Sequence, residues 1–223
     1  MKSIYPVIMA LLFCIGCATD HQFERRVTNP VTPSPSSIAD IRPPKERKLV
    51  AIAGFENKST YAADKLWDTS SQMLSSNLIQ IGYFRVVEWG KMKQLFDWDA
   101  LSASSIVKIP AMRDEARKIL LCEYFLSGAI TRFDVNQRSQ VSALYKKKVI
   151  DTTIRVDLML QSAYTGEYMG ASTDEWTVSQ EFEGGLTGGA TGTWDPASAN
   201  LALNKAIEGA LAKLIRTYSR QYD

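Results

Sequence analysis

The first 17 residues most constrain how this chain can fold. One basic residue, Lys2, is followed by an apolar stretch over residues 7–15, and the segment ends in Gly16-Cys17. This layout is typical of a signal peptide for export, because so short an apolar stretch cannot serve as a permanent membrane span. A short buried helix of the folded domain is the alternative interpretation. We expect residues 1–16 to be removed, so that the rest of the chain folds outside the cytoplasm.

The segment Cys14-Ile15-Gly16-Cys17 resembles the lipobox of bacterial lipoproteins. Gly16 is the small residue before the expected cleavage, and the thiol of Cys17 is the expected acceptor of the lipid. Cys14 stands where such sequences usually have leucine. Ala18 follows in place of aspartate, which by resemblance to enterobacterial lipoproteins favours the outer membrane. Cys17 is therefore the predicted lipid attachment site, and each buried methylene of its acyl chains strengthens anchoring by roughly 0.8 kcal/mol.

The remaining cysteines and histidine limit the chemistry of the mature chain. Only Cys17 and Cys122 remain after residue 16, so a lipidated Cys17 leaves Cys122 without a disulfide partner. Cys122 lies among apolar residues, where a buried and unreactive thiol is expected. The one histidine, His21, precedes the folded domain. Catalysis by a Ser–His–Asp or Cys–His group and a histidine metal site are therefore not expected, and we predict no enzyme, no metal and no cofactor.

Charge and composition are those of an ordinary globular domain. The 223 residues include 26 Lys and Arg against 24 Asp and Glu, a net charge of +2, and 45% are hydrophobic. This apolar fraction excludes disorder of the whole chain. The absence of a basic excess argues against nucleic acid as a partner.

A proline-rich segment precedes the domain. Residues 17–46 contain five prolines among serine, threonine and charged residues: Pro30, Pro33, Pro35, Pro43 and Pro44. This composition predicts a flexible, extended tether behind the lipidated cysteine rather than a folded part. We place the single folded domain at residues 47–223.

Within the domain, strand-like and helix-like patterns alternate. Short apolar runs predict strands at 49–55, 83–89 and 124–130, and apolar residues at helical spacing predict helices at 64–81, 91–96, 109–120 and 197–218. Gly82 is expected to end the first of these helices. Residues 152–160 alternate cleanly and predict a half-buried antiparallel strand, to which residues 168–182 return. The order predicts an α/β fold with a mixed sheet and flanking helices.

Four segments resemble, in their order and spacing, the curli-secretion channel family (CsgG/HfaB). They are Phe55-Glu56-Asn57-Lys58-Ser59, then Tyr83-Phe84-Arg85-Val86-Val87-Glu88, then residues 117–130, and Arg155-Val156-Asp157-Leu158 leading into Tyr164-Thr165-Gly166-Glu167. The resemblance covers residues 48–218. It implies a CsgG-like periplasmic domain similar to the TolB N-terminal domain. It also implies a homo-oligomeric ring beneath the outer membrane, with exported protein subunits and periplasmic accessory proteins as partners.

The resemblance also implies two β-hairpins per subunit that contribute to an oligomeric barrel. They would occupy residues 131–155 and 172–196, with Val141 and Val178 facing lipid and Thr177 on the opposite face. Trp176 and Trp194 are the candidate membrane-interface residues. Hairpins on the surface of a non-spanning ring are the alternative, because three polar residues share the face assigned to lipid. These are Gln137, Ser139 and Gln180.

Other features have both a functional and a structural interpretation. Tyr61 is the candidate pore-constriction residue by resemblance, and packing or capping is the alternative. Four neighbouring carboxylates, Asp97, Asp99, Asp114 and Glu115, are better explained as solvated helix ends than as a glycosidase pair. Lys146-Lys147-Lys148 is either a solvated hairpin end or a binding site for phosphate or lipid head groups. The glycine-rich residues 184–192 lack the phosphate-loop pattern and predict a turn.

Two functions follow from these expectations. The first is an outer-membrane lipoprotein whose ring or channel exports or assembles an extracellular polymer such as curli-like fibres. The second is a non-spanning periplasmic scaffold ring that supports polysaccharide export, a flagellar structure or cell-wall synthesis. Insertion of residues 131–155 and 172–196 into the membrane would distinguish the two.

Overall fold

A computed structural model shows how the chain folds. It describes residues 43–61, 66–95, 106, 108–141, 146–184 and 192–222, together with the backbone of residues 23–28. The predicted signal peptide, the lipid site Cys17, Asp97 and Asp99 lie outside the described residues.

The core of the fold is a mixed sheet of six strands with helices packed on it. The strands are β1 (Phe23–Thr28), β2 (Leu49–Asn57), β3 (Arg85–Val87), β4 (Tyr124–Val141), β5 (Lys146–Ser162) and β6 (Tyr168–Gly184). Their order across the sheet is β1-β6-β5-β4-β2-β3. Strand β2 runs parallel to β3 and β4, and the other neighbours are antiparallel. The predicted mixed α/β architecture is confirmed.

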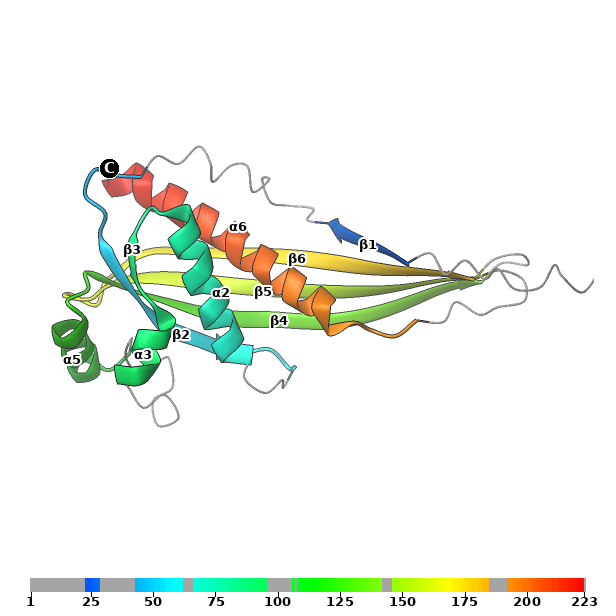
Figure 1. Ribbon diagram of the computed structural model, residues 1–223, viewed down its shortest axis with the longest axis horizontal. Helices are drawn as coiled ribbons and strands as arrows, with labels where there is room; N and C mark the ends of the chain where they lie inside the picture. Colours follow the sequence, from blue (N-terminus) through cyan, green and yellow to red (C-terminus); the bar gives the residue numbers. More distant parts are fainter. Residues whose placement is uncertain are drawn as a thin grey trace, which may run out of the picture.

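The described helices are α2 (Leu66–Ile81), α3 (Trp89–Leu95), α5 (Pro110–Leu120) and α6 (Pro196–Tyr222). Helix α6 lies diagonally across β5 and β6, with α2 beside it (Figure 1). Gly82 ends α2 as predicted: its φ is +68°, and its N–H donates to the carbonyl of Leu78 at 3.1 Å. None of the described helices is both long and apolar enough to cross a membrane.

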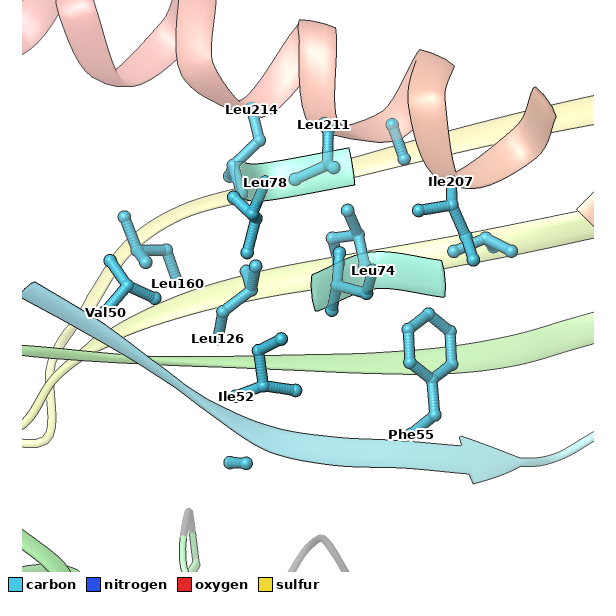
Figure 2. Packing of buried hydrophobic residues seen from close by; sticks show 14 of the residues in the cluster. Val50, Ile52, Phe55, Leu74, Leu78, Leu126, Leu160, Ile207, Leu211 and Leu214 are labelled. Atoms are coloured by element: carbon cyan, nitrogen blue, oxygen red, sulfur yellow. The ribbon is translucent and has the colours of Figure 1, made fainter. Parts of the chain in front are cut away.

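The hydrophobic core lies between these two helices and the sheet. Figure 2 shows Leu74 and Leu78 of α2 and Leu211 of α6 directed toward residues of β2, β4 and β5. The predicted alternation of β5 is confirmed, because every second residue from Ile154 to Leu160 is fully buried. Burial of each large apolar side chain stabilises the fold by roughly 1.5–3 kcal/mol.

One close contact fixes α6 on β6. The carboxylate of Asp174 is buried and accepts hydrogen bonds from Lys213 Nζ at 2.9 Å and Trp176 Nε1 at 3.1 Å. Gly209 of α6 lies directly above it, and a Cβ atom there would stand 1.6 Å from Asp174 Oδ2. Only a residue without a side chain allows the helix to approach β6 this closely.

Strands β4, β5 and β6 continue beyond the helix-covered part of the sheet. The pairing of β2 with β4 ends at Asn57 and Ile130, and the three strands run on together toward a distant tip (Figure 1). We call residues 132–141 of β4, 146–155 of β5 and 175–184 of β6 the arm. Because the polar residues after Thr131 lack an apolar run, the sequence analysis ended the strand at Ile130, eleven residues before Val141.

The strand β1, which lies beside the arm, comes from the predicted tether. From here on the arm includes β1 at its β6 edge. Residues 23–28 form β1 and pair antiparallel with β6, from Phe23 opposite Phe182 to Thr28 opposite Thr177. The expectation of a wholly flexible segment at 17–46 is therefore wrong for these six residues. Pairing with β1 covers backbone groups along the β6 edge that would otherwise be exposed.

Candidate interaction arm

The arm contains both regions in which hairpins are expected, and the structure confirms one of them. Strands β4 and β5 form an antiparallel hairpin whose outer part pairs residues from Arg132 with Arg155 to Val141 with Lys146. The predicted hairpin at 131–155 is thus present. It continues past 155 to Ser162, because β5 also crosses the helix-covered part of the sheet.

The second predicted hairpin, at 172–196, is wrong. Residues 172–184 belong to the single strand β6, which has β5 on one side and β1 on the other. Residues 192–195 are not in a strand, and α6 begins at Pro196. In the described part of this region there is no returning strand, because β1 already occupies the place beside β6 where such a strand would pair.

One face of the arm is polar along its length. Glu175 of β6 accepts hydrogen bonds from Arg155 Nε at 3.0 Å and from Arg132 Nη1 at 3.3 Å. Arg132 also donates to Asp134 on its own strand, and this hydrogen bond is the main cause that raises the pKa of Arg132. These pairs connect β4, β5 and β6 where they leave the helix-covered part of the sheet.

The same face stays polar toward the tip. Thr153 and Thr177 share a hydrogen bond of 2.8 Å between their hydroxyls, and Ser179 donates to Asp151 at 2.6 Å. Closer to the tip, Lys147 pairs with Glu181 at 2.7 Å. Because ion pairs and hydroxyls cover all three strands, this face would be costly to expose to lipid.

On the opposite face of the arm, the chain itself covers residues of β5 and β6, whereas β4 is exposed from Val135 to Val141. Val178 and Gln180 are fully buried, and Gln180 Oε1 accepts a hydrogen bond from the backbone N–H of Asp195 at 3.2 Å. The expectation that Val178 faces lipid is therefore wrong in this structure. Val141, its predicted counterpart, is 72% exposed near the tip.

Three aromatic side chains form a collar at the base of the arm: Tyr61, Phe133 and Trp194. Tyr61 stacks on Phe133 with ring centroids 4.1 Å apart and meets Trp194 edge-on at 6.3 Å. The indole N–H of Trp194 donates to Thr152 Oγ1 at 3.0 Å. Through the collar, Trp194 before α6 and Tyr61 after β2 both pack on the hairpin of β4 and β5.

These contacts place the predicted aromatic residues within one copy of the chain. Tyr61 packs in the collar, and its role as a pore constriction stays a prediction. Trp176 is only 9% exposed, and Trp194 contacts Tyr61 and Thr152; their place at a membrane interface also stays a prediction. Neither the collar nor β1 was predicted from the sequence. The alternating Phe23, Arg25 and Val27 are the only local signal for β1.

The remaining candidate groups are Cys122 and the carboxylates Asp114 and Glu115. The predicted burial of Cys122 is confirmed, and this burial raises the pKa of its thiol to about 12. Asp114 and Glu115 lie on α5. No group of three or more His, Cys, Asp or Glu among the described residues could hold a metal ion.

Most of the chain matches one known protein family. Residues 33–221 match the family described as "Curli production assembly/transport component CsgG". No curated protein shows a significant match.

Three solved structures illustrate the fold similarity. The chain is 13% identical to lipoprotein GNA1162 from Neisseria meningitidis, covering 69% of this chain and 92% of that one with a TM-score of 0.42. It is 10% identical to the LpoB C-terminal domain from Salmonella enterica, covering 63% and 93% with a TM-score of 0.42. A PelC dodecamer from Paraburkholderia phytofirmans is 13% identical, covering 86% and 98% with a TM-score of 0.34. These likenesses are distant, and no residue role is transferred from them.

Proposed function

Because the chain belongs to the family of the curli production assembly/transport component CsgG, we propose that it is a lipoprotein that acts as a homo-oligomeric ring. The ring is anchored through Cys17 to the periplasmic face of the outer membrane. Its role is to support the export or assembly of an extracellular polymer, and it performs no enzymatic step. Family membership supports the polymer-related role, and the edges of the arm support the ring.

The unpaired edge of β4 is the main observation that supports assembly into a ring. Beyond Ile130, β4 pairs only with β5 among the described strands, which leaves the edge from Arg132 to Val141 uncovered. An exposed strand edge of this length is a ready template for pairing with a further strand, because its N–H and C=O groups are not used within the sheet. The other edge of the arm, β1, is also a terminal strand of the sheet.

The strand directions allow these two edges to pair between copies. Each strand from β4 through β5 and β6 to β1 is antiparallel to the next, so β1 and β4 point in opposite directions. β1 of one copy can therefore pair antiparallel with β4 of the next. Two different surfaces meet in such a contact, and repeated contacts of this kind close into a ring when the rotation between copies permits.

The two faces of the arm favour a ring that does not span the membrane. One face carries ion pairs on all three strands. On the other face Val178 and Gln180 are buried, and the exposed residues of β4 include the polar Gln137 and Ser139. A spanning strand needs one apolar face toward lipid. We therefore favour the scaffold form of the ring and expect no conductance when the purified protein is added to planar bilayers.

A transport channel is the second candidate, and strand length is the observation that favours it. Strands β4, β5 and β6 have 18, 17 and 17 residues, whereas about 9–11 residues suffice for a membrane strand. Reproducible conductance from the wild-type protein would support this candidate over the scaffold.

Cross-linking between copies tests the edge contact. Val27, Val178, Thr152 and Val135 form one row across the arm, so Val27 and Val135 mark the same level on its two edges. Within one copy they are three strand spacings apart, about 14 Å. In a Val27→Cys, Val135→Cys double variant, a short bis-maleimide linker should therefore join neighbouring copies into a ladder of covalent multimers.

A matched variant controls for random collisions. Leu121 is 77% exposed and precedes β4 at the end far from the tip, so Val27→Cys combined with Leu121→Cys should give no ladder. Equal ladders from both double variants would contradict edge pairing. Fatty-acid labelling tests the anchor separately, because the label should be lost when Cys17 is replaced by serine.

A further inference from the structure

The direction of β1 brings its N-terminal end toward the tip of the arm. Phe23 pairs with Phe182, which lies two residues before the end of β6, whereas Thr28 pairs with Thr177, farther from the tip. Figure 1 shows β1 beside the part of β6 that runs toward the tip. Phe23, the first residue of β1, is therefore the residue of this strand that lies nearest the tip.

The length of chain outside the strand limits where the predicted lipid can be. Cys17 precedes Phe23 by six residues, which reach at most about 20 Å when fully extended. If β1 were not paired, the leash would run from Cys17 to Leu49, which is 32 residues and a reach of about 110 Å. Pairing of β1 therefore shortens the free chain between Cys17 and the sheet from 32 residues to six.

The chemistry of the described tip suits an anionic, amphiphilic surface. Lys146 opens β5 as an exposed residue and pairs across the hairpin with Val141, which is 72% exposed. Two further lysines follow, of which Lys147 pairs with Glu181 and Lys148 donates to the carbonyl of Gly192. An exposed ammonium group beside an exposed apolar side chain is suited to the head-group level of a membrane, where lysine is attracted to anionic lipids.

From the strand direction, the short leash and the tip chemistry together, we propose that β1 holds the tip of the arm against the anionic phospholipid surface of the membrane that contains the lipidated Cys17. This rests on the lipid anchor of the proposed function and adds a fixed orientation and a second membrane contact. The tip lies among the head groups and does not enter the hydrocarbon core. The end of the domain around Leu121 faces away from the membrane.

Site-specific fluorescence quenching tests the orientation in the full-length lipidated protein. A fluorophore is attached at Val141→Cys or, as the matched control, at Leu121→Cys; Cys122 is buried and should take up no label. The vesicles contain phosphatidylethanolamine, phosphatidylglycerol and a lipid with a quencher on its head group. We expect severalfold stronger quenching at position 141 than at position 121. Equal quenching at the two positions would overturn the proposal, and so would stronger quenching from the middle of the acyl chains than from the head groups.

A proline variant tests whether β1 causes the orientation. Val27→Pro removes a backbone donor within β1 and prevents regular pairing, whereas Val31→Pro lies outside the strand. Val27→Pro should lower quenching at position 141 to the level at position 121, while Val31→Pro should leave it unchanged. Unchanged quenching with Val27→Pro would overturn the proposed role of β1. Failure of the lipid anchor has a different result, because the protein would then not float with vesicles.

A charge variant tests the recognition of anionic lipid. Lys146→Gln should weaken tip contact with phosphatidylglycerol vesicles by roughly fivefold, the effect of one lysine near an anionic surface. Lys118→Gln on α5 is the matched control and should have no effect. Equal tip quenching for wild type and Lys146→Gln would show that the lysine is not part of the contact and would overturn this part of the proposal.

Discussion

The helix-covered part of the sheet and the arm use the same strands for different purposes. Near α2 and α6, β5 buries every second side chain against the helices, and its apolar residues are fully enclosed. In the arm, the same strands carry ion pairs on one face and leave the β4 edge unpaired. The difference indicates that the covered part supplies most of the stability of the fold, whereas the arm has the free strand edge to which our proposal assigns the contact between copies.

Two side-chain truncations test whether the helix-covered part supplies more stability than the arm. Leu211→Ala removes a fully buried side chain between α6 and the sheet and should lower the free energy of unfolding by about 2–5 kcal/mol. Val141→Ala at the exposed tip should change it by less than about 0.5 kcal/mol. Denaturant titration of both variants measures the difference, and similar losses would mean that the arm contributes to the core.

A substitution at the close contact between α6 and β6 should cause the next largest loss of stability. Gly209→Ala places a Cβ against the buried carboxylate of Asp174 and should cost about 1–3 kcal/mol. Gly90→Ala in α3 is the matched control, because no atom lies within 4 Å of the added Cβ. It should be neutral or slightly stabilising in a thermal melt, since alanine favours helix. A neutral Gly209→Ala variant would show that the contact is loose.

Two tryptophan variants compare the arm with the helix-covered part, because each removes one hydrogen bond from one of the two regions. Trp194→Phe removes the donor to Thr152 in the collar, and Trp89→Phe removes the 2.7 Å hydrogen bond from Trp89 of α3 to Asp68 of α2. Each substitution should lower the free energy of unfolding by about 1 kcal/mol. Hydrogen exchange should rise in the arm for Trp194→Phe and in α2 and α3 for Trp89→Phe. The same exchange pattern in both variants would contradict a separate role for the collar.

Removal of an ion pair from the arm should change the stability least. Glu175 pairs with Arg132 and Arg155, but all three side chains are partly exposed. Glu175→Gln should therefore change the free energy of unfolding by less than about 1 kcal/mol. Denaturant titration at low and high salt checks this value. A loss well above this value that persists at high salt would mean that the polar face contributes to stability as well as to surface charge.

The sequence predicted the helix-covered part better than the arm, for a physical reason. Alternation at 152–160 identifies residues that share a face, and burial of that face under α6 makes the pattern clear. In the arm, alternation correctly separates Thr177 from Val178, but it does not say whether lipid or the chain itself covers a face. The partner of a strand is likewise not encoded in the strand, so β6 was expected to pair with residues that follow it and not with Phe23–Thr28.

The central claim is that copies of this chain join through the edges of the arm into a closed ring. The most direct test is native mass measurement, with electron imaging, of the full-length lipidated protein extracted in mild detergent. The account predicts one discrete copy number, a ring in the images, and loss of that species when Val27→Pro removes β1. A monomer at the same concentration, or a ring that persists unchanged with Val27→Pro, would contradict it.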